Sequence, residues 1–289
     1  MSWYKKKSVL LALIVLLLVS FALAGCNALE EKENPGATPG VQQDAKEPEQ
    51  KLNLAVYYVK TTENDTYLIR EIHQVSPAAD AHRAALEELI NVNPVIPGAA
   101  RVLPAATKVN SINIKDGLAT VDFSKEVLSA NVGAAGEAMG IKSIVNTLTE
   151  FPEINKVSFT VEGKTDEAMD WWGHVGLYQQ PFSRDLSCVY EPAIWINSPQ
   201  PGQKVASPLE VSGSARVFEA TVNIRLIDNA GKTITEDFTT ASEGAPGRGD
   251  FKYSLDFDAP APGQGELEVF WTSPKDGKEL DKVSVPVNW

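Results

Sequence analysis

The final stretch of the chain, residues 192–289, shows no helical periodicity. Short segments with alternating apolar residues are separated by turn sequences such as PQPG, DNAG and PKDG. Val222, Ile224 and Leu226 show this alternation in one of the segments. About seven short strands in fewer than about 100 residues are typical of an antiparallel β-sandwich, so we predict an all-β domain here.

Residues 51–185 combine strand and helix periodicities. Ser76-Pro77 predicts the start of a helix and Asn93-Pro94 its end. Asp116-Gly117 lies between two alternating segments and predicts a hairpin turn. The order is strand, strand, helix, strand, strand, helix, strand, over the segments 52–59, 66–75, 77–93, 111–115, 118–123, 135–150 and 156–163. This order predicts an α+β domain with two helices on one face of a mixed sheet.

The N-terminus carries three lysines, Lys5–Lys7, followed by an uncharged apolar run that ends in small residues before Cys26. This pattern predicts a secretory signal peptide, and the alternative is an uncleaved transmembrane anchor. Leu23-Ala24-Gly25-Cys26 resembles the lipobox of bacterial lipoproteins, which implies a lipid on the Cys26 sulfur and cleavage before it. We therefore expect an extracytoplasmic protein held by lipid to the outer face of the cytoplasmic membrane.

These patterns divide the chain into four parts. We expect a signal peptide at 1–25 and a lipidated cysteine with a disordered tether, rich in Pro, Gly, Glu and Gln, at 26–50. The α+β domain then covers 51–188 and the β-sandwich 189–289.

The net charge limits which molecules the protein can bind, and the cysteine content limits its disulfides. The net charge is −12, and cleavage of residues 1–25 would remove three lysines and no acidic residue. An acidic surface disfavours nucleic acid and anionic headgroups. If Cys26 carries lipid, Cys188 has no partner for a disulfide, and we interpret it as a small buried residue rather than a nucleophile.

No sequence motif predicts catalysis. There is no nucleotide-binding loop, zinc-binding histidine pair, nucleophile elbow or cysteine cluster, and the only histidines are His73, His82 and His174. Acidic pairs such as Glu63 and Asp65 occur in turn sequences, where such residues are common. We therefore predict no catalytic residue, no metal site and no cofactor.

Several segments of the first domain together resemble a known family. VYYV, GLATVDFSKE, AMGIKSIVNTLTEFPEINKVSFTVEGK and QQPFSRD resemble the GerMN domain of bacterial sporulation and germination lipoproteins. INSPQPGQKVASPLEVSGSARVFEATVNIRLIDNAG and GDFKYSLDF resemble the immunoglobulin-like domain that often follows it. The resemblance implies a role in sporulation or spore germination, with envelope or sporulation proteins, or a second copy of the chain, as partners.

Two segments contain candidate binding residues. Trp171, Trp172 and His174 lie in MDWWGHVGLY, where exposed rings could stack on a sugar or anchor a protein, or alternatively cover the end of the sheet. In VFEA we expect Phe218 to fill the sandwich and Glu219 to accept backbone hydrogen bonds in a turn, with ligand binding as the alternative. The predicted function is a non-catalytic interaction module of the envelope; the alternatives are binding of peptidoglycan or another envelope polymer, and a wall-modifying hydrolase.

Overall fold

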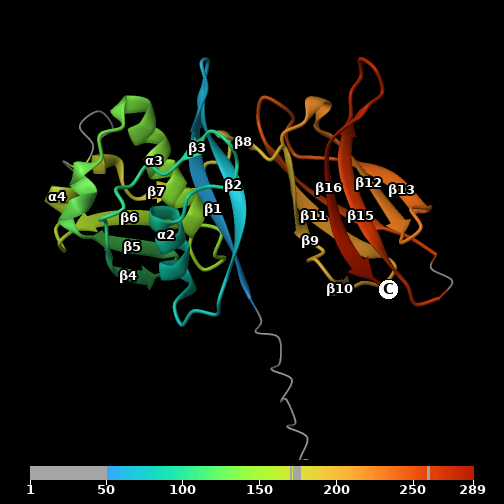
Figure 1. The fold of residues 1–289 in the computed structure, drawn as a ribbon, viewed down its shortest axis with the longest axis horizontal. Helices are drawn as coiled ribbons and strands as arrows, with labels where there is room; N and C mark the ends of the chain where they lie inside the picture. The colour runs from blue at the N-terminus through green and yellow to red at the C-terminus, as the bar shows by residue number, and fades with distance from the viewer. Residues whose placement is uncertain (1–50, 170, 172–176, 259–260) are drawn as a thin grey trace, which may run out of the picture. The chain divides into compact units, whose positions relative to one another are not determined.

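A computed structural model describes residues 51–169, 171, 177–258 and 261–289. The predicted signal peptide, Cys26 and the tether lie outside the described residues. The first domain contains β1 Leu52–Thr61, β2 Thr66–Val75, α2 Ala81–Asn91, β3 Ala99–Ala100, β4 Val109–Lys115, β5 Leu118–Phe123, α3 Gly133–Leu148, β6 Lys156–Val161, α4 Thr165–Met169, β7 Phe182–Ser183 and β8 Val189–Glu191, and the short 3₁₀ helices Lys125–Ser129 and Leu177–Gln179 (Figure 1).

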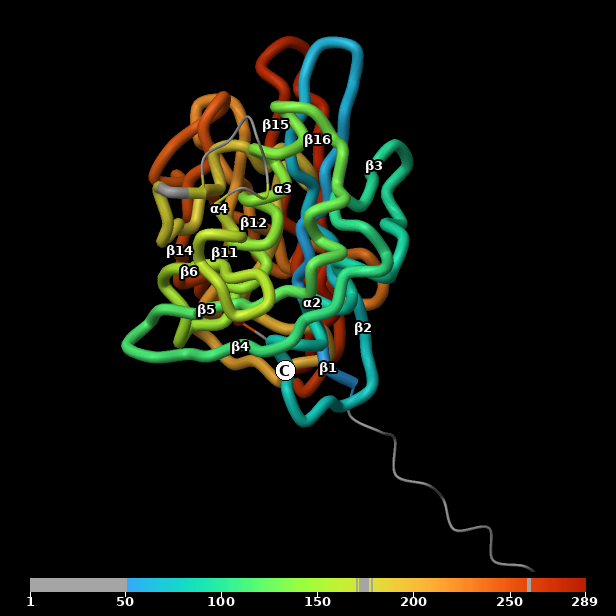
Figure 2. Tube along the Cα trace, turned by 90° about the vertical axis from the view of Figure 1, so that its left-hand side faces the viewer, coloured from blue at the N-terminus to red at the C-terminus, as the bar shows by residue number. Residues whose placement is uncertain are grey.

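The first domain has an α+β fold, as predicted, but its strands form two sheets rather than one. One sheet has the order β3-β1-β2-β8 and the other β4-β5-β6-β7. In the second sheet β5 and β6 are parallel and helix α3 makes the crossover between them, while β4 pairs antiparallel with β5 (Figures 1 and 2). The tight β4–β5 turn occurs at Asp116-Gly117 as predicted, with φ of 51° and 81°.

Helix α3 explains why the strands do not form one continuous sheet. The backbone N–H of Tyr57 in β1 donates to Thr147 Oγ1 at 3.1 Å, and Ser143 Oγ donates to the Tyr57 carbonyl. The helix hydroxyls therefore satisfy backbone groups at the edge of β1 that a further strand would otherwise pair with. Strand periodicity shows which segments are strands but does not show which edges a helix closes.

Helix α2 begins four residues later than Ser76-Pro77 predicts. Asp80 is the N-cap, and its carboxylate accepts a hydrogen bond from the Arg83 N–H at 3.0 Å. The predicted N-cap was wrong because the segment after Ser76 continues as an irregular turn to Asp80, which is also a good capping residue. The helix buries Ala85, Leu86, Leu89 and Ile90, which lie on one side of it.

One hydrophobic core joins both sheets and both long helices of the first domain. Val121 and Phe123 of β5, Ile144 of α3 and Phe159 of β6 are fully buried in it. The other side of the β1–β2 hairpin carries a smaller cluster made of Tyr57, Val59, Leu68, Cys188, Val189 and Trp195. The hairpin is therefore buried on both sides at residues 56–59 of β1 and 67–69 of β2.

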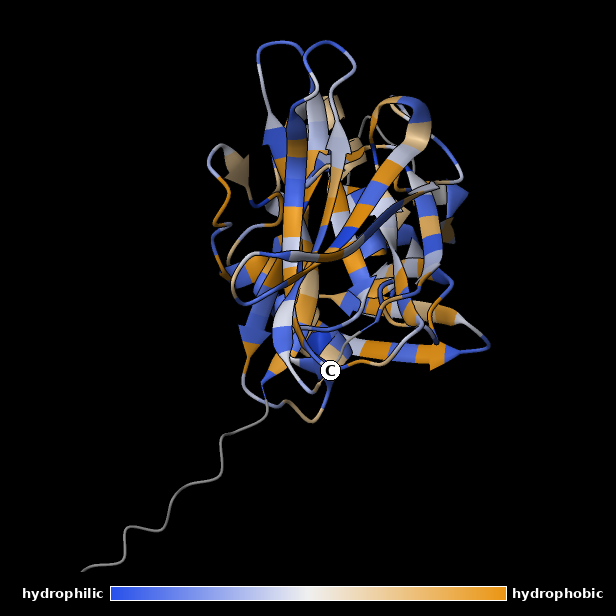
Figure 3. Ribbon diagram, turned by 90° about the vertical axis from the view of Figure 1, so that its right-hand side faces the viewer, coloured by the Kyte–Doolittle hydropathy of each residue, from blue (hydrophilic) through white to orange (hydrophobic). Residues whose placement is uncertain are grey.

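The second domain is a two-sheet β-sandwich, and all seven predicted strands are present. Its strands are β9 Ile194–Ser198, β10 Gln203–Lys204, β11 Leu209–Ala215, β12 Thr221–Asp228, β13 Thr233–Thr240, β14 Gly249–Leu255, β15 Gln264–Thr272 and β16 Glu279–Asn288, with a 3₁₀ turn at Phe218–Ala220. A five-stranded sheet, β10-β16-β15-β12-β13, faces a three-stranded sheet, β14-β11-β9. Apolar and polar residues alternate along these strands in Figure 3, and the apolar ones form the core between the sheets.

Within the described ranges, no helix has both the length and the apolar character needed to cross a membrane.

Candidate interaction surface

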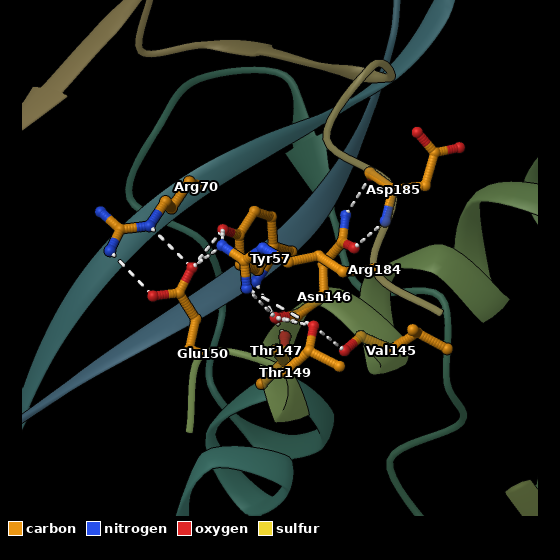
Figure 4. A network of polar contacts seen from close by, with 9 residues as sticks. All are labelled: Tyr57, Arg70, Val145, Asn146, Thr147, Thr149, Glu150, Arg184 and Asp185. Atoms are coloured by element: carbon orange, nitrogen blue, oxygen red, sulfur yellow. Dashed lines mark hydrogen bonds and ion pairs between the residues drawn. The ribbon is translucent and has the colours of Figure 1, made fainter. Parts of the chain in front are cut away.

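A partly buried ionic network lies where the end of α3 meets the β1–β2 hairpin (Figure 4). The Glu150 carboxylate contacts Arg70 Nη2 at 3.2 Å and Arg184 Nη2 at 2.5 Å, and it accepts a hydrogen bond from the Tyr57 hydroxyl. Burial alone would raise the pKa of Glu150, but the two arginines and the hydroxyl outweigh it and hold the pKa at about 2. Glu150 is therefore an anion whose oxygens are already occupied.

The same network holds the segment that leads into the second domain. Asn146 of α3 forms a reciprocal pair with Asp185, donating from Nδ2 to the carbonyl at 2.7 Å and accepting from the amide at 2.9 Å. Two residues of β8 then pair parallel with β2. The Glu150 carboxylate, the Asn146 amide and the pairing of β8 with β2 thus position residues 184–191 on the first domain.

An arginine–tryptophan contact continues this attachment. The Arg248 guanidinium lies 3.9 Å from the centre of the Trp195 ring and donates to the carbonyls of Val189, Pro192 and Ala193 at 2.7–3.2 Å. Arg70 lies over the same indole at 4.9 Å. Burial lowers the pKa of Arg248, and its planar fork of donors fits three backbone carbonyls. Arg248 has a structural role, since its Nε, Nη1 and Nη2 atoms each donate to a backbone carbonyl.

His73 is also held by ionic contacts in a buried position. Its ring nitrogens lie 2.7 Å from Glu88 Oε2 and 3.0 Å from Glu71 Oε2. Burial opposes the charge, but the two carboxylates outweigh it and raise the pKa of His73. Glu71 also accepts the backbone N–H groups of Val95 and Ile96. Because both ring nitrogens are engaged, His73 has no free nitrogen to act as a general base.

Cys188 is buried, in line with its interpretation as a small core residue. Its thiol lies 3.5 Å from the Asp185 carbonyl, and burial raises its pKa to about 11. A thiol of this pKa is almost entirely protonated at neutral pH and is a poor nucleophile. In the described part of the chain, no group of three or more His, Cys, Asp or Glu side chains has an arrangement suited to a metal ion.

Trp171 is not available as a binding residue. It is only 4% exposed and packs edge-on against Phe123 and Phe159, with ring centroids 5.5 and 5.7 Å apart. Trp171 follows α4 and closes the core over β5 and β6, which corresponds to the alternative in which the ring covers the end of the sheet. Trp172 and His174 lie outside the described residues.

Phe218 and Glu219 are exposed at one corner of the sandwich. Phe218 is 49% exposed, so the expectation that it fills the sandwich was wrong, and Val217 is buried instead. Glu219 and Ala220 both have left-handed backbone conformations, with φ of 54° and 58°. Such conformations are strained for residues with a side chain, at a cost of about 1–3 kcal/mol each, and this turn directs Phe218 toward solvent.

A second exposed phenylalanine lies on the edge strand β13. Phe238 is 61% exposed, and β13 pairs only with β12. Phe218 and Phe238 lie toward the same end of the β12–β13 ribbon, where Thr221 pairs with Thr240. Phe238 was not predicted as a binding residue from the sequence, although the sequence contains a signal for its exposure. Phe238 lies two residues along its strand from each of the polar residues Glu236 and Thr240, which indicates that all three side chains lie on the solvent side.

Comparison with known families agrees with this two-domain architecture. Residues 55–167 match the family described as sporulation and spore germination, and residues 193–278 match the immunoglobulin-like domain of bacterial spore germination. The chain belongs to the sporulation and spore germination family, with residues 55–167 as its family domain. The protein is thus associated with spore formation or germination.

Individual relatives come from Bacillus subtilis. The chain is 29% identical over 154 residues to the spore germination protein GerM of strain 168, a match that covers 52% of this chain and 40% of GerM. A structure of the first GerMN domain of GerM is 30% identical, with 39% of this chain and 84% of that chain covered and a TM-score of 0.34. The tandem GerMN domains of GerM are 25% identical, with coverage of 53% and 50% and a TM-score of 0.40. The chain therefore spans less than half of the length of its curated relative.

Proposed function

We propose that this protein is a non-catalytic interaction module that docks with other proteins of the envelope during spore formation or germination. The observation that carries the proposal is the exposure of two phenylalanines, Phe218 and Phe238, at one corner of the second domain. Large aromatic side chains that remain exposed are enriched at protein interfaces, where they supply much of the binding energy.

The state of the titratable groups supports a role without catalysis. His73 and Cys188 are buried and Glu150 is partly buried, and all three are engaged in structural contacts. A catalytic acid, base or nucleophile needs a reactive atom that faces a substrate. In the described residues these three groups hold the fold together and do not face one common cleft, which disfavours a wall-modifying hydrolase.

Membrane attachment through a lipid on Cys26 remains part of the proposal. The basic, apolar and small-residue pattern that ends in Leu23-Ala24-Gly25-Cys26 supports it. Metabolic labelling with a fatty acid tests it, because Cys26→Ala should give an unlabelled precursor. Label retained on that variant would contradict lipidation at Cys26.

The experiment that tests the proposed function is crosslinked affinity capture of the full-length protein from the cells that make it, followed by mass spectrometry. We expect a reproducible set of envelope or sporulation proteins, or a second copy of the chain. Capture of wall fragments with no consistent protein partner would contradict the proposal and favour polymer binding. Turnover of a wall polymer by the purified protein would instead indicate an enzyme.

A further inference from the structure

The outer face of the five-stranded sheet contains two phenylalanines in one cross-strand row. Phe238 of β13 pairs with Asn223 of β12, which in turn pairs with Phe270 of β15. Phe270 is only 2% exposed although it lies on the outer face, whereas Phe238 is 61% exposed. Two rings on the same face and in the same row therefore differ in whether anything covers them.

Two cations of the chain itself cover Phe270. The Arg225 guanidinium lies 4.7 Å and the Lys282 ammonium 5.4 Å from the ring centroid. Arg225 pairs with Glu268 at 2.6 Å and with Glu279 at 2.8 Å, and Lys282 contacts the same two carboxylates at 3.3 and 2.6 Å. The aromatic face and the paired carboxylates together hold the cations in place.

Phe238 lies near a carboxylate, that of Glu236, but among the described residues it has no cation over its ring as Phe270 does. Glu236 is two residues away on the same side of β13, and its contact with Arg225, at 3.6 Å, is longer than those of Glu268 and Glu279. Two cations thus face three carboxylates, and Glu236 is the most weakly paired of the three. In the described part of the chain no arginine or lysine covers the Phe238 ring.

We propose that Phe238 and Glu236 form a docking site for an arginine or lysine side chain in a basic segment of a partner protein. The incoming cation would lie over the Phe238 ring and pair with Glu236, reproducing the arrangement at Phe270. A second copy of this chain is a poor occupant because its net charge of −12 opposes self-association at an acidic site. This inference rests on the proposed function and names the chemistry of the partner.

A photocrosslinking amino acid at Thr240 tests the site directly. Thr240 is exposed and lies two residues from Phe238 on the same side of β13, so the probe leaves Phe238 and Glu236 intact. The full-length protein is irradiated in the cells that make it, and the crosslinked peptide is identified by mass spectrometry. We expect a crosslink to a partner segment that contains arginine or lysine.

Matched variants separate the ring and the carboxylate from general surface effects. Phe238→Ala and Glu236→Gln should each lower the crosslink yield about two- to fivefold, which is the usual scale for one exposed cation–π contact or ion pair. Glu266→Gln removes one negative charge from an exposed position on β15 and should leave the yield unchanged. Equal yields for the Glu236→Gln and Glu266→Gln variants would overturn the proposal.

The other possible results of the crosslinking experiment also test the proposed site. Crosslinks from Thr240 to a glycan, to a second copy of the chain or to an acidic segment would contradict the proposed site. If the probe captures nothing at Thr240 while probes elsewhere on the two domains capture envelope proteins, the site fails and the proposed function stands. If no position on either domain captures a protein, the proposed function fails as well.

Discussion

The Nη2 atom of Arg184 lies 2.5 Å from Oε1 of Glu150. Arg184 belongs to the segment before β8, and Glu150 lies just beyond the end of α3. Arg70 of β2 reaches the other carboxylate oxygen at 3.2 Å. One carboxylate therefore joins a helix end, a strand and the segment that leads to the second domain, so the loss of Glu150 should destabilise the first domain.

Glu150→Gln should lower the free energy of unfolding by about 3 kcal/mol, since breaking a buried ion pair leaves the partner charges uncompensated. Urea denaturation of the full-length protein measures the change. Glu153→Gln is the matched control, because the Glu153 side chain is about half exposed and contacts His82 Nε2 at the surface, at 2.7 Å. The control should change stability by less than about 0.5 kcal/mol, and equal losses for the two variants would contradict the account.

Acid should destabilise the protein through the same carboxylate. The pKa of Glu150 falls from 4.5 to about 2 on folding, so its contribution is fully present above about pH 4.5 and is lost as the pH falls through about 2. The shift corresponds to about 3 kcal/mol. Denaturation curves across this range should show a steeper loss for the wild type than for Glu150→Gln, and parallel losses would show that Glu150 is not the titrating group.

Alkali should weaken the contacts of His73. Its pKa is raised by Glu71 and Glu88, so the stabilisation is fully present below the ordinary value of 6.5 and is lost as the pH rises through the raised value. We expect an NMR titration of the imidazole to show a midpoint above 6.5. His73→Gln should flatten the fall in stability above pH 6.5. A midpoint at or below 6.5 would contradict the ionic contacts.

Trp171→Ala should behave as a core substitution. Removal of the buried indole from between Phe123 and Phe159 should cost about 3–5 kcal/mol of unfolding free energy. Phe218→Ala removes an exposed ring and should change stability by less than about 0.5 kcal/mol. Thermal and urea denaturation of the two variants make the comparison. Little effect from Trp171→Ala would return that residue to the list of surface candidates.

Most of the fold could be predicted from local patterns in the sequence. Seven of the eight strands of the sandwich, the Asp116-Gly117 turn and helix α2 each have a signal confined to a few neighbouring residues. The division into two sheets could not be predicted in this way. It depends on Ser143 and Thr147 of α3 meeting the edge of β1, a contact between residues about 90 positions apart.

The site was less predictable for the same reason. The Glu150 network joins four segments, and nothing in the local sequence around Glu150 indicates that Arg70 and Arg184 converge on it. The exposure of aromatic side chains in turns was also hard to predict, because a hydrophobic residue in a turn can face either the core or the solvent. Phe218 faces the solvent, contrary to the expectation that it fills the sandwich, whereas Trp171 faces the core, which was one of the two alternatives for it.

The measurement that tests the central claim most directly is complementation of a strain that lacks the protein, scored by the yield of heat-resistant spores and by their rate of germination. If the protein acts through its surface, Phe238→Ala should fail to complement, while Cys188→Ala and His82→Gln should complement fully at normal protein levels. Full complementation by Phe238→Ala, or failure of either of the other two variants at normal protein levels, would contradict the account.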